Sequence, residues 1–117
     1  MLTPLITLTV ILAVVFSATG VLKLVGQRRM CEQMDHIGVS AGLTKVVGAL
    51  ELAAVVGLVV GLYWSPAGIA AAVGLVLQMI GAVVYHLRAR DPLSVALMPL
   101  LFGVAAAAVA VLHVLRG

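Results

Sequence analysis

Four long apolar stretches dominate the chain, covering about residues 3–22, 43–63, 66–87 and 93–115. A helix of ~20 apolar residues crosses the ~30 Å hydrocarbon core of a bilayer. Backbone amides in lipid have to be hydrogen-bonded within the protein, which favours helices for such segments. The pattern therefore predicts an all-α integral membrane protein with four transmembrane helices.

Two of the three connections between these stretches are short, 64–65 and 88–92. Helices joined by short connections pack as antiparallel neighbours. Residues 1–117 are thus expected to form one domain, an antiparallel four-helix bundle.

The first connection, roughly residues 23–42, is longer and has its own periodicity. Met30, Met34 and Ile37 recur at helical spacing on one face, and charged residues occupy the other positions. This pattern favours a short amphipathic helix lying on the membrane surface. An ordinary polar loop is the alternative.

Composition and charge support the membrane assignment. Hydrophobic residues make up 64% of the chain and charged residues only 9%, against roughly 25% charged residues in soluble domains. The net charge of +3 comes from basic residues that flank apolar stretches, which argues for lipid contact and against nucleic-acid binding. A single cysteine, Cys31, excludes a disulfide within the chain, and no zinc-type ligand spacing occurs.

The basic residues also predict an orientation. Only Arg116 belongs to the side of the second connection, and six others belong to the opposite side: Lys23, Arg28, Arg29, Lys45, Arg88 and Arg90. Cytoplasmic loops of membrane proteins are enriched in Lys and Arg. The first and third connections should therefore be cytoplasmic, with both termini outside the plasma membrane.

Glu51 is the main candidate for chemistry, because a carboxylate inside an apolar span is costly and usually has a partner. At 1.5 Å per residue, Glu51, Gln78 and Ser17 all lie about 9–12 Å below the cytoplasmic boundary. Side chains on a helix lean toward its N-terminus, so Lys23 and His86 should lean into the membrane toward Glu51.

These residues also have structural interpretations. Glu51 can simply fix the register of the helices, Lys23 can reach up to the interface, and His86 and Tyr85 can be interfacial residues. Burial favours a neutral Glu51 and a lysine partner favours a charged one, so both remain open.

Three segments resemble the DoxX-like family of small bacterial four-helix membrane proteins: GVLKL at 20–24, VGALEL at 47–52 and GLVLQMIGAVVYHLR at 74–88. The resemblance implies a four-helix bundle in the inner membrane, with Lys23, Glu51 and His86 as its polar signature. It also implies an association with membrane redox assemblies.

The leading functional hypothesis is a redox-associated component that binds a membrane quinone or another lipophilic small molecule. Glu51, Lys23 and His86 would handle protons, and Gln78, Ser17 and Tyr85 would contact the bound molecule. Partner redox proteins or further copies of the chain would complete the assembly. The alternatives are a cofactor-free isomerase or hydrolase acting on a lipophilic substrate, a small proton-coupled transporter, and a structural subunit.

Overall fold

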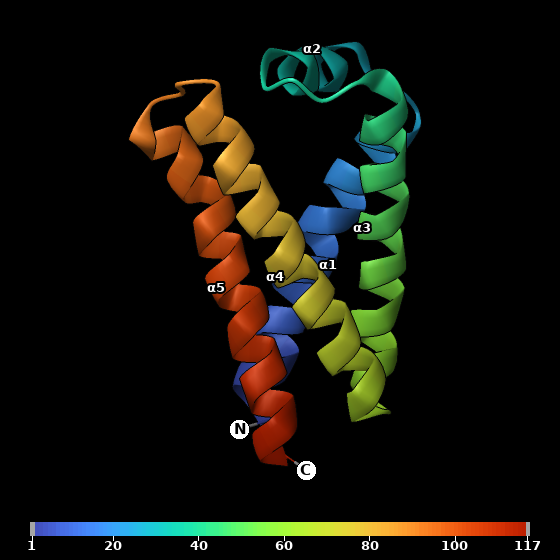
Figure 1. The fold of residues 1–117 in the computed structure, drawn as a ribbon. Coiled ribbons are helices and arrows are strands. Elements are labelled where there is room, and N and C mark those ends of the chain that lie inside the picture. Colours follow the sequence, from blue (N-terminus) through green and yellow to red (C-terminus); the bar gives the residue numbers. More distant parts are fainter. Residues whose placement is uncertain (1, 117) are drawn as a thin grey trace.

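The computed structural model describes residues 2–116, and this part of the chain forms five helices with no strand (Figure 1). The helices are α1 (Leu2–Leu24), α2 (Arg28–His36), α3 (Ala41–Gly61), α4 (Ser65–Arg88) and α5 (Leu93–Arg116). Each end of the four long helices lies within two residues of the sequence prediction. The predicted all-α fold is confirmed.

All four long helices are long and apolar enough to cross a membrane. The short helix α2 lies across one end of the bundle, where α1 and α4 end and α3 and α5 begin (Figure 1). Met30 and Met34 on α2, and Ile37 just after it, are partly buried, whereas most other residues of α2 are exposed. The amphipathic helix predicted for the first connection is thus present, with its apolar face toward the bundle.

Local hydrogen bonds explain where several helices begin and end. The Ser40 hydroxyl accepts a hydrogen bond from the Leu43 N–H at the start of α3, and the Gln27 side chain accepts one from the Met30 N–H at the start of α2. At the other end of the bundle, Arg116 Nη2 donates to the Gly61 carbonyl oxygen at 2.9 Å. A guanidinium at a helix C-terminus satisfies a free carbonyl and complements the helix dipole.

Glycines let the helices approach closely at two crossings. On α3, Gly61 faces the backbone of Gly68 on α4 so closely that a Cβ would collide with it. A Cβ on Gly48 would lie 2.8 Å from the carbonyl oxygen of Gly20 on α1. Small residues allow membrane helices to pack backbone to backbone, and these contacts bring α1, α3 and α4 together.

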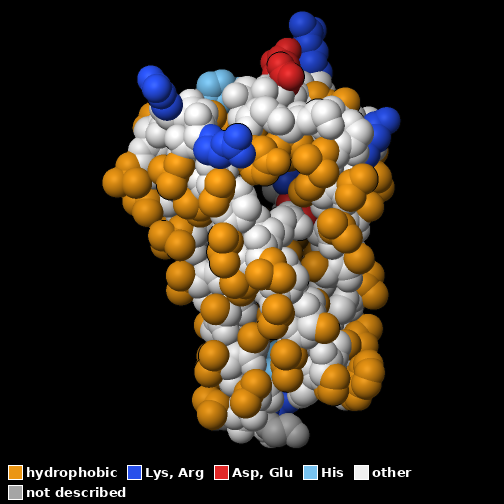
Figure 2. Space-filling model, viewed as in Figure 1, with side chains coloured by type: hydrophobic (Ala, Val, Ile, Leu, Met, Phe, Trp, Pro, Cys, Tyr) orange, Lys and Arg blue, Asp and Glu red, His pale blue; other side chains and the backbone are white. Residues whose placement is uncertain are grey.

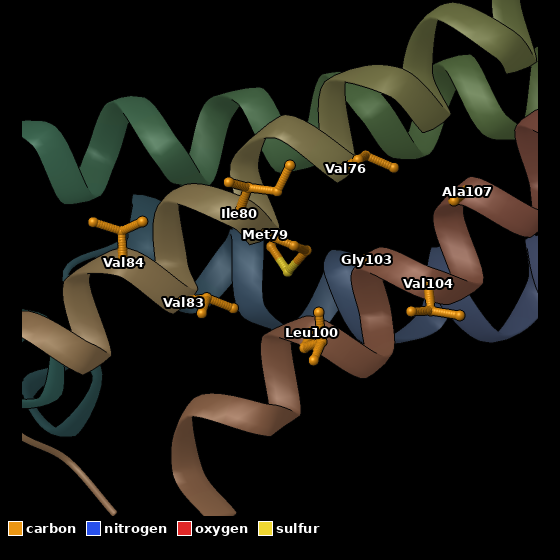
Figure 3. Close-up of a pocket in the computed structure, with 9 residues that line it drawn as sticks. All are labelled: Val76, Met79, Ile80, Val83, Val84, Leu100, Gly103, Val104 and Ala107. Atoms are coloured by element: carbon orange, nitrogen blue, oxygen red, sulfur yellow. The ribbon is translucent and has the colours of Figure 1, made fainter. Parts of the chain in front are cut away.

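The outer surface of the bundle is largely apolar along the length of the four long helices (Figure 2). Charged side chains gather at the end covered by α2. A groove of about 430 Å³ between α4 and α5 is lined by apolar side chains and Gly103, and Met79 points into the space between these helices (Figure 3). A surface of this kind matches hydrocarbon, so the chain is a multi-pass membrane protein.

Candidate functional site

A cavity of about 840 Å³ lies inside the half of the bundle that α2 covers. In Figure 1, α3 and α4 are close at their connecting turn and diverge toward α2. Figure 2 shows a hollow below α2 with basic and acidic side-chain atoms inside it. All five helices contribute to its wall, and Gln33 and Met34 of α2, with Ile37 just after it, form its cover. Its volume is in the range of small-molecule sites.

Glu51 lies in the wall of this cavity and is only 1% exposed. Three side chains donate hydrogen bonds to its carboxyl group. Lys23 Nζ lies 2.7 Å from Oε1, Gln78 Nε2 lies 2.8 Å from Oε1, and Thr19 Oγ1 lies 3.0 Å from Oε2. A carboxylate can only accept hydrogen bonds. A set of three donors therefore matches a charged Glu51 compensated by the Lys23 ammonium.

Lys23 is a member of this group that a bound molecule can also reach. Its side chain is 13% exposed, lines the cavity and uses one hydrogen bond for Glu51. An ammonium group has three N–H donors. Among residues 2–116, no second hydrogen bond of Lys23 Nζ is found, so two of its donors are available beside the cavity.

Glu51, Gln78 and Ser17 were predicted to lie at the same depth in the membrane, and the structure brings two of them into contact. Glu51 and Gln78 are hydrogen-bonded, whereas Ser17 does not line the cavity, and the hydroxyl that reaches Glu51 belongs to Thr19. The depth estimate ignored rotation about the helix axis. Thr19 is four residues before Lys23 and shares its face, whereas Ser17 is six residues before it, about 240° away at 100° per residue.

His86 and Tyr85 both line the cavity, but His86 does not join the group around Glu51. Its Nδ1 lies 2.6 Å from Oδ2 of Asp91, in the connection between α4 and α5. His86 is eight residues beyond Gln78, about 12 Å along α4. Lys23, Glu51 and His86 thus line one cavity, but His86 belongs to a separate polar group.

Asp91 and His36 belong to the second polar group and were missed by sequence reasoning. His36 Nε2 on α2 lies 2.6 Å from the other carboxylate oxygen of Asp91. Hydrogen bonds from His86 and from His36 hold the pKa of Asp91 below its ordinary value. Residues 36 and 91 are far apart in the sequence, and a polar residue in a loop carries no signal of its partner.

His113 lies outside this site. It is 1% exposed near the opposite end of the bundle and packs against Gly68 of α4. Neither ring nitrogen has a hydrogen-bond partner among residues 2–116. His113 therefore acts as a packing residue between α4 and α5.

Comparison with known proteins agrees with the fold. The model of the DoxX-like family matches residues 7–109, which include all the residues of both polar groups. Neither the curated proteins nor the solved structures gave a match. The match covers most of the chain, and with four apolar helices in the order that the family resemblance implied, this protein belongs to the DoxX-like family.

Proposed function

We propose that this protein binds a lipophilic small molecule with a polar carbonyl-type head group, such as a membrane quinone, and serves a redox-associated membrane assembly. The observation that carries the proposal is the Lys23–Glu51 ion pair in the wall of a cavity whose other lining is mostly apolar. Few polar groups in an apolar pocket are typical of sites that orient a small ligand.

The residues present fit a quinone head group. The apolar side chains Phe16, Met98 and Phe102 can pack against a ring. The free N–H donors of Lys23 suit a carbonyl oxygen, and an oxygen that gains negative charge binds such a donor more strongly. When bound, a quinone supplies two-electron, two-proton redox chemistry.

The residues of the chain would have separate roles in this proposal. Lys23 Nζ would donate a hydrogen bond to the head group, and Glu51 would keep the ammonium in place and compensate its charge. Gln78 and Thr19 orient Glu51 through their hydrogen bonds. Tyr85 lines the same wall and would contact the bound molecule. Ser17, on the other face of α1, would not.

We further propose a bacterial plasma-membrane location with the α2 side in the cytoplasm and both termini outside. The one-sided distribution of Lys and Arg supports this orientation. In it, the covered cavity would lie in the cytoplasmic half of the membrane. Partner redox proteins would supply and remove electrons, and further copies of this chain would be a second way to complete the assembly.

Mass spectrometry of lipids and quinones that copurify with the protein tests the proposal. We expect the wild type to retain a quinone or a similar carbonyl compound, and Lys23→Met to reduce its amount about tenfold, the effect of losing one charge-assisted hydrogen bond. Glu51→Gln should also reduce it, because the ammonium loses its counter-ion.

Lys45→Met is the matched control, since Lys45 lies near the same end of the bundle and is exposed. It should retain the molecule as the wild type does. Retention that is equal in the wild type and in Lys23→Met, or that does not exceed the background of protein-free micelles, would contradict the proposal.

The second candidate is a cofactor-free enzyme acting on a lipophilic substrate. It is favoured by two acid–base groups at one cavity, the Lys23–Glu51 pair in its wall and His86, which lines it and is paired with Asp91. In that case the retained molecule would be converted by the purified protein without an added electron donor or acceptor.

A further inference from the structure

Asp91 forms a bridge between two imidazole rings at the covered end of the cavity. Its Oδ2 is 2.6 Å from Nδ1 of His86 on α4, and its Oδ1 is 2.6 Å from Nε2 of His36 on α2. The Asp91 side chain is 10% exposed, that of His86 22% and that of His36 62%. The three groups thus form a row from the cavity wall to the water-facing surface.

The backbone at the end of α4 fixes Asp91 beside His86. The Arg90 N–H donates to the Leu87 carbonyl oxygen and the Asp91 N–H donates to that of His86. This pair of bonds is the Schellman arrangement, which needs a left-handed residue at its centre, and Arg90 has a φ of 58°. Asp91 therefore contacts His86 through both its main chain and its side chain.

The bond to Asp91 determines the tautomer of neutral His86. Because its pKa is held below the ordinary value, Asp91 is a carboxylate at neutral pH and can only accept hydrogen bonds. Nδ1 of His86 must then carry the proton, and Nε2 bears a lone pair. No described residue is bonded to Nε2, while His86 lines the cavity.

We propose that His86, oriented by Asp91, is an acid–base group that exchanges a proton with the molecule bound in the cavity, and that His36 connects this pair to water. The inference rests on the proposed function and adds a proton acceptor separate from the Lys23–Glu51 pair. Asp91 is a positioning residue in this scheme, and His86 is the group that contacts the ligand.

The proton balance of the step is simple. His86 Nε2 takes up the proton that the bound molecule releases, and the resulting imidazolium is paired with the Asp91 carboxylate. The reverse transfer returns the proton to the molecule. The other titratable groups that face His86 are His36 on α2 and, in the cavity wall, Lys23, Glu51 and the neighbouring Tyr85. The α5 residues of that wall are Met98, Pro99 and Phe102.

The tautomer is measured directly on ¹⁵N-histidine-labelled protein, by long-range ¹H–¹⁵N correlation spectra at a pH where His86 is neutral. Variants His36→Gln and His113→Gln assign the three rings. We expect the Nδ1–H form for His86 in the wild type. Asp91→Ala should convert it mainly to the Nε2–H form, the usual preference of a free imidazole, and Asp35→Ala, an exposed carboxylate on α2, should leave it unchanged.

A wild-type His86 in the Nε2–H form would overturn the proposal, and this result needs no variant to fold. An Asp91→Ala protein with an unchanged His86 spectrum would overturn it as well. If Asp91→Ala does not fold, the wild-type spectrum still decides, and Asp91→Asn, whose amide oxygen can accept the Nδ1–H bond, should keep the Nδ1–H form.

The second readout is binding of decylubiquinone as a probe between about pH 5.5 and 8.5, on either side of the usual histidine titration. A protonated His86 donates to a quinone oxygen, so wild-type affinity should fall about tenfold over this range. His86→Gln should remove this pH dependence of the affinity, and Asp91→Ala should move the pH at which the affinity changes. Asp35→Ala should leave the pH dependence as in the wild type.

The two readouts separate the failure of this inference from the failure of the proposed function. Without any decylubiquinone binding in the wild type, quinone binding would be wrong, and the tautomer would still decide whether Asp91 orients His86. Binding whose pH dependence is the same in His86→Gln as in the wild type would overturn the acid–base role of His86 and leave the ligand proposal standing.

Discussion

Glu51 is stabilised inside an apolar bundle by donors from two other helices, Lys23 and Thr19 on α1 and Gln78 on α4. Desolvating a charge costs several kcal/mol unless a partner and further hydrogen bonds compensate it. The arrangement satisfies this condition on both carboxylate oxygens. At the residue scale, the consequence is a strong coupling between Lys23 and Glu51.

Lys23→Leu is expected to lower the free energy of unfolding by about 3–5 kcal/mol, because it leaves a buried carboxylate without its cation. The double variant Lys23→Leu/Glu51→Leu should be more stable than Lys23→Leu alone, since neither charge remains. Unfolding by SDS in mixed micelles, followed by circular dichroism, gives both values, and Lys45→Leu is the control.

Equal stability of the wild type, Lys23→Leu and the double variant would show that no buried pair exists. Glu51→Leu completes the comparison: if the loss of stability in the double variant equals the sum of the losses in Lys23→Leu and Glu51→Leu, the two residues act independently.

The close approach of α3 and α4 at Gly61 and Gly68 determines where these helices cross and, by their divergence, where the cavity opens. On the α4–α5 connection, the Schellman turn brings Asp91 back over His86, and His36 ties α2 to the same carboxylate. At the element scale, the Gly61–Gly68 contact therefore positions the start of α4, and the Asp91 carboxylate positions its end.

Gly61→Ala should destabilise the protein by about 1–3 kcal/mol, the range for overpacking a tight contact, because its Cβ would collide with the Gly68 backbone. Gly74→Ala is the matched control on α4. No atom of the neighbouring elements lies within 4 Å of its added Cβ, so the gain in helix propensity should stabilise by up to about 1 kcal/mol.

Thermal unfolding of the wild type and both variants in one detergent measures the change in stability that each substitution causes. If Gly61→Ala proved as stable as Gly74→Ala, the backbone contact between α3 and α4 would not exist in the folded protein.

The whole molecule has one strongly charged end and one weakly charged end. The ends of α1 and α4 and the starts of α3 and α5 meet at the end covered by α2, and Arg116 marks the other. This asymmetry predicts a single orientation in the membrane, with the covered end on the cytoplasmic side.

A membrane-impermeant maleimide should therefore leave Cys31 on α2 unlabelled in intact cells and label it after the cells are opened. Cys31 is the only thiol in the sequence and is partly exposed, so the readout is specific. A cysteine placed at Tyr63, in the opposite connection, in a Cys31→Ser background should show the reverse pattern. Labelling of Cys31 from outside would reverse the assigned orientation.

The sequence alone determined where the long helices lie, which end of the bundle is charged, and that burying the Glu51 carboxylate in an apolar span needs a partner. These are local properties, because apolar length, charge and periodicity are read along one segment without knowing its neighbours. Even α2 could be predicted in this way, from the spacing of Met30, Met34 and Ile37.

Only the tertiary structure decided which side chains meet. Thr19 in place of Ser17, and Asp91 as the partner of His86, depend on the rotation and crossing of helices and on the path of a loop. The turn at Arg90 was hidden because the usual glycine is absent there. The cavity itself exists because α3 and α4 diverge from a glycine contact, a property of two helices together that neither sequence segment contains.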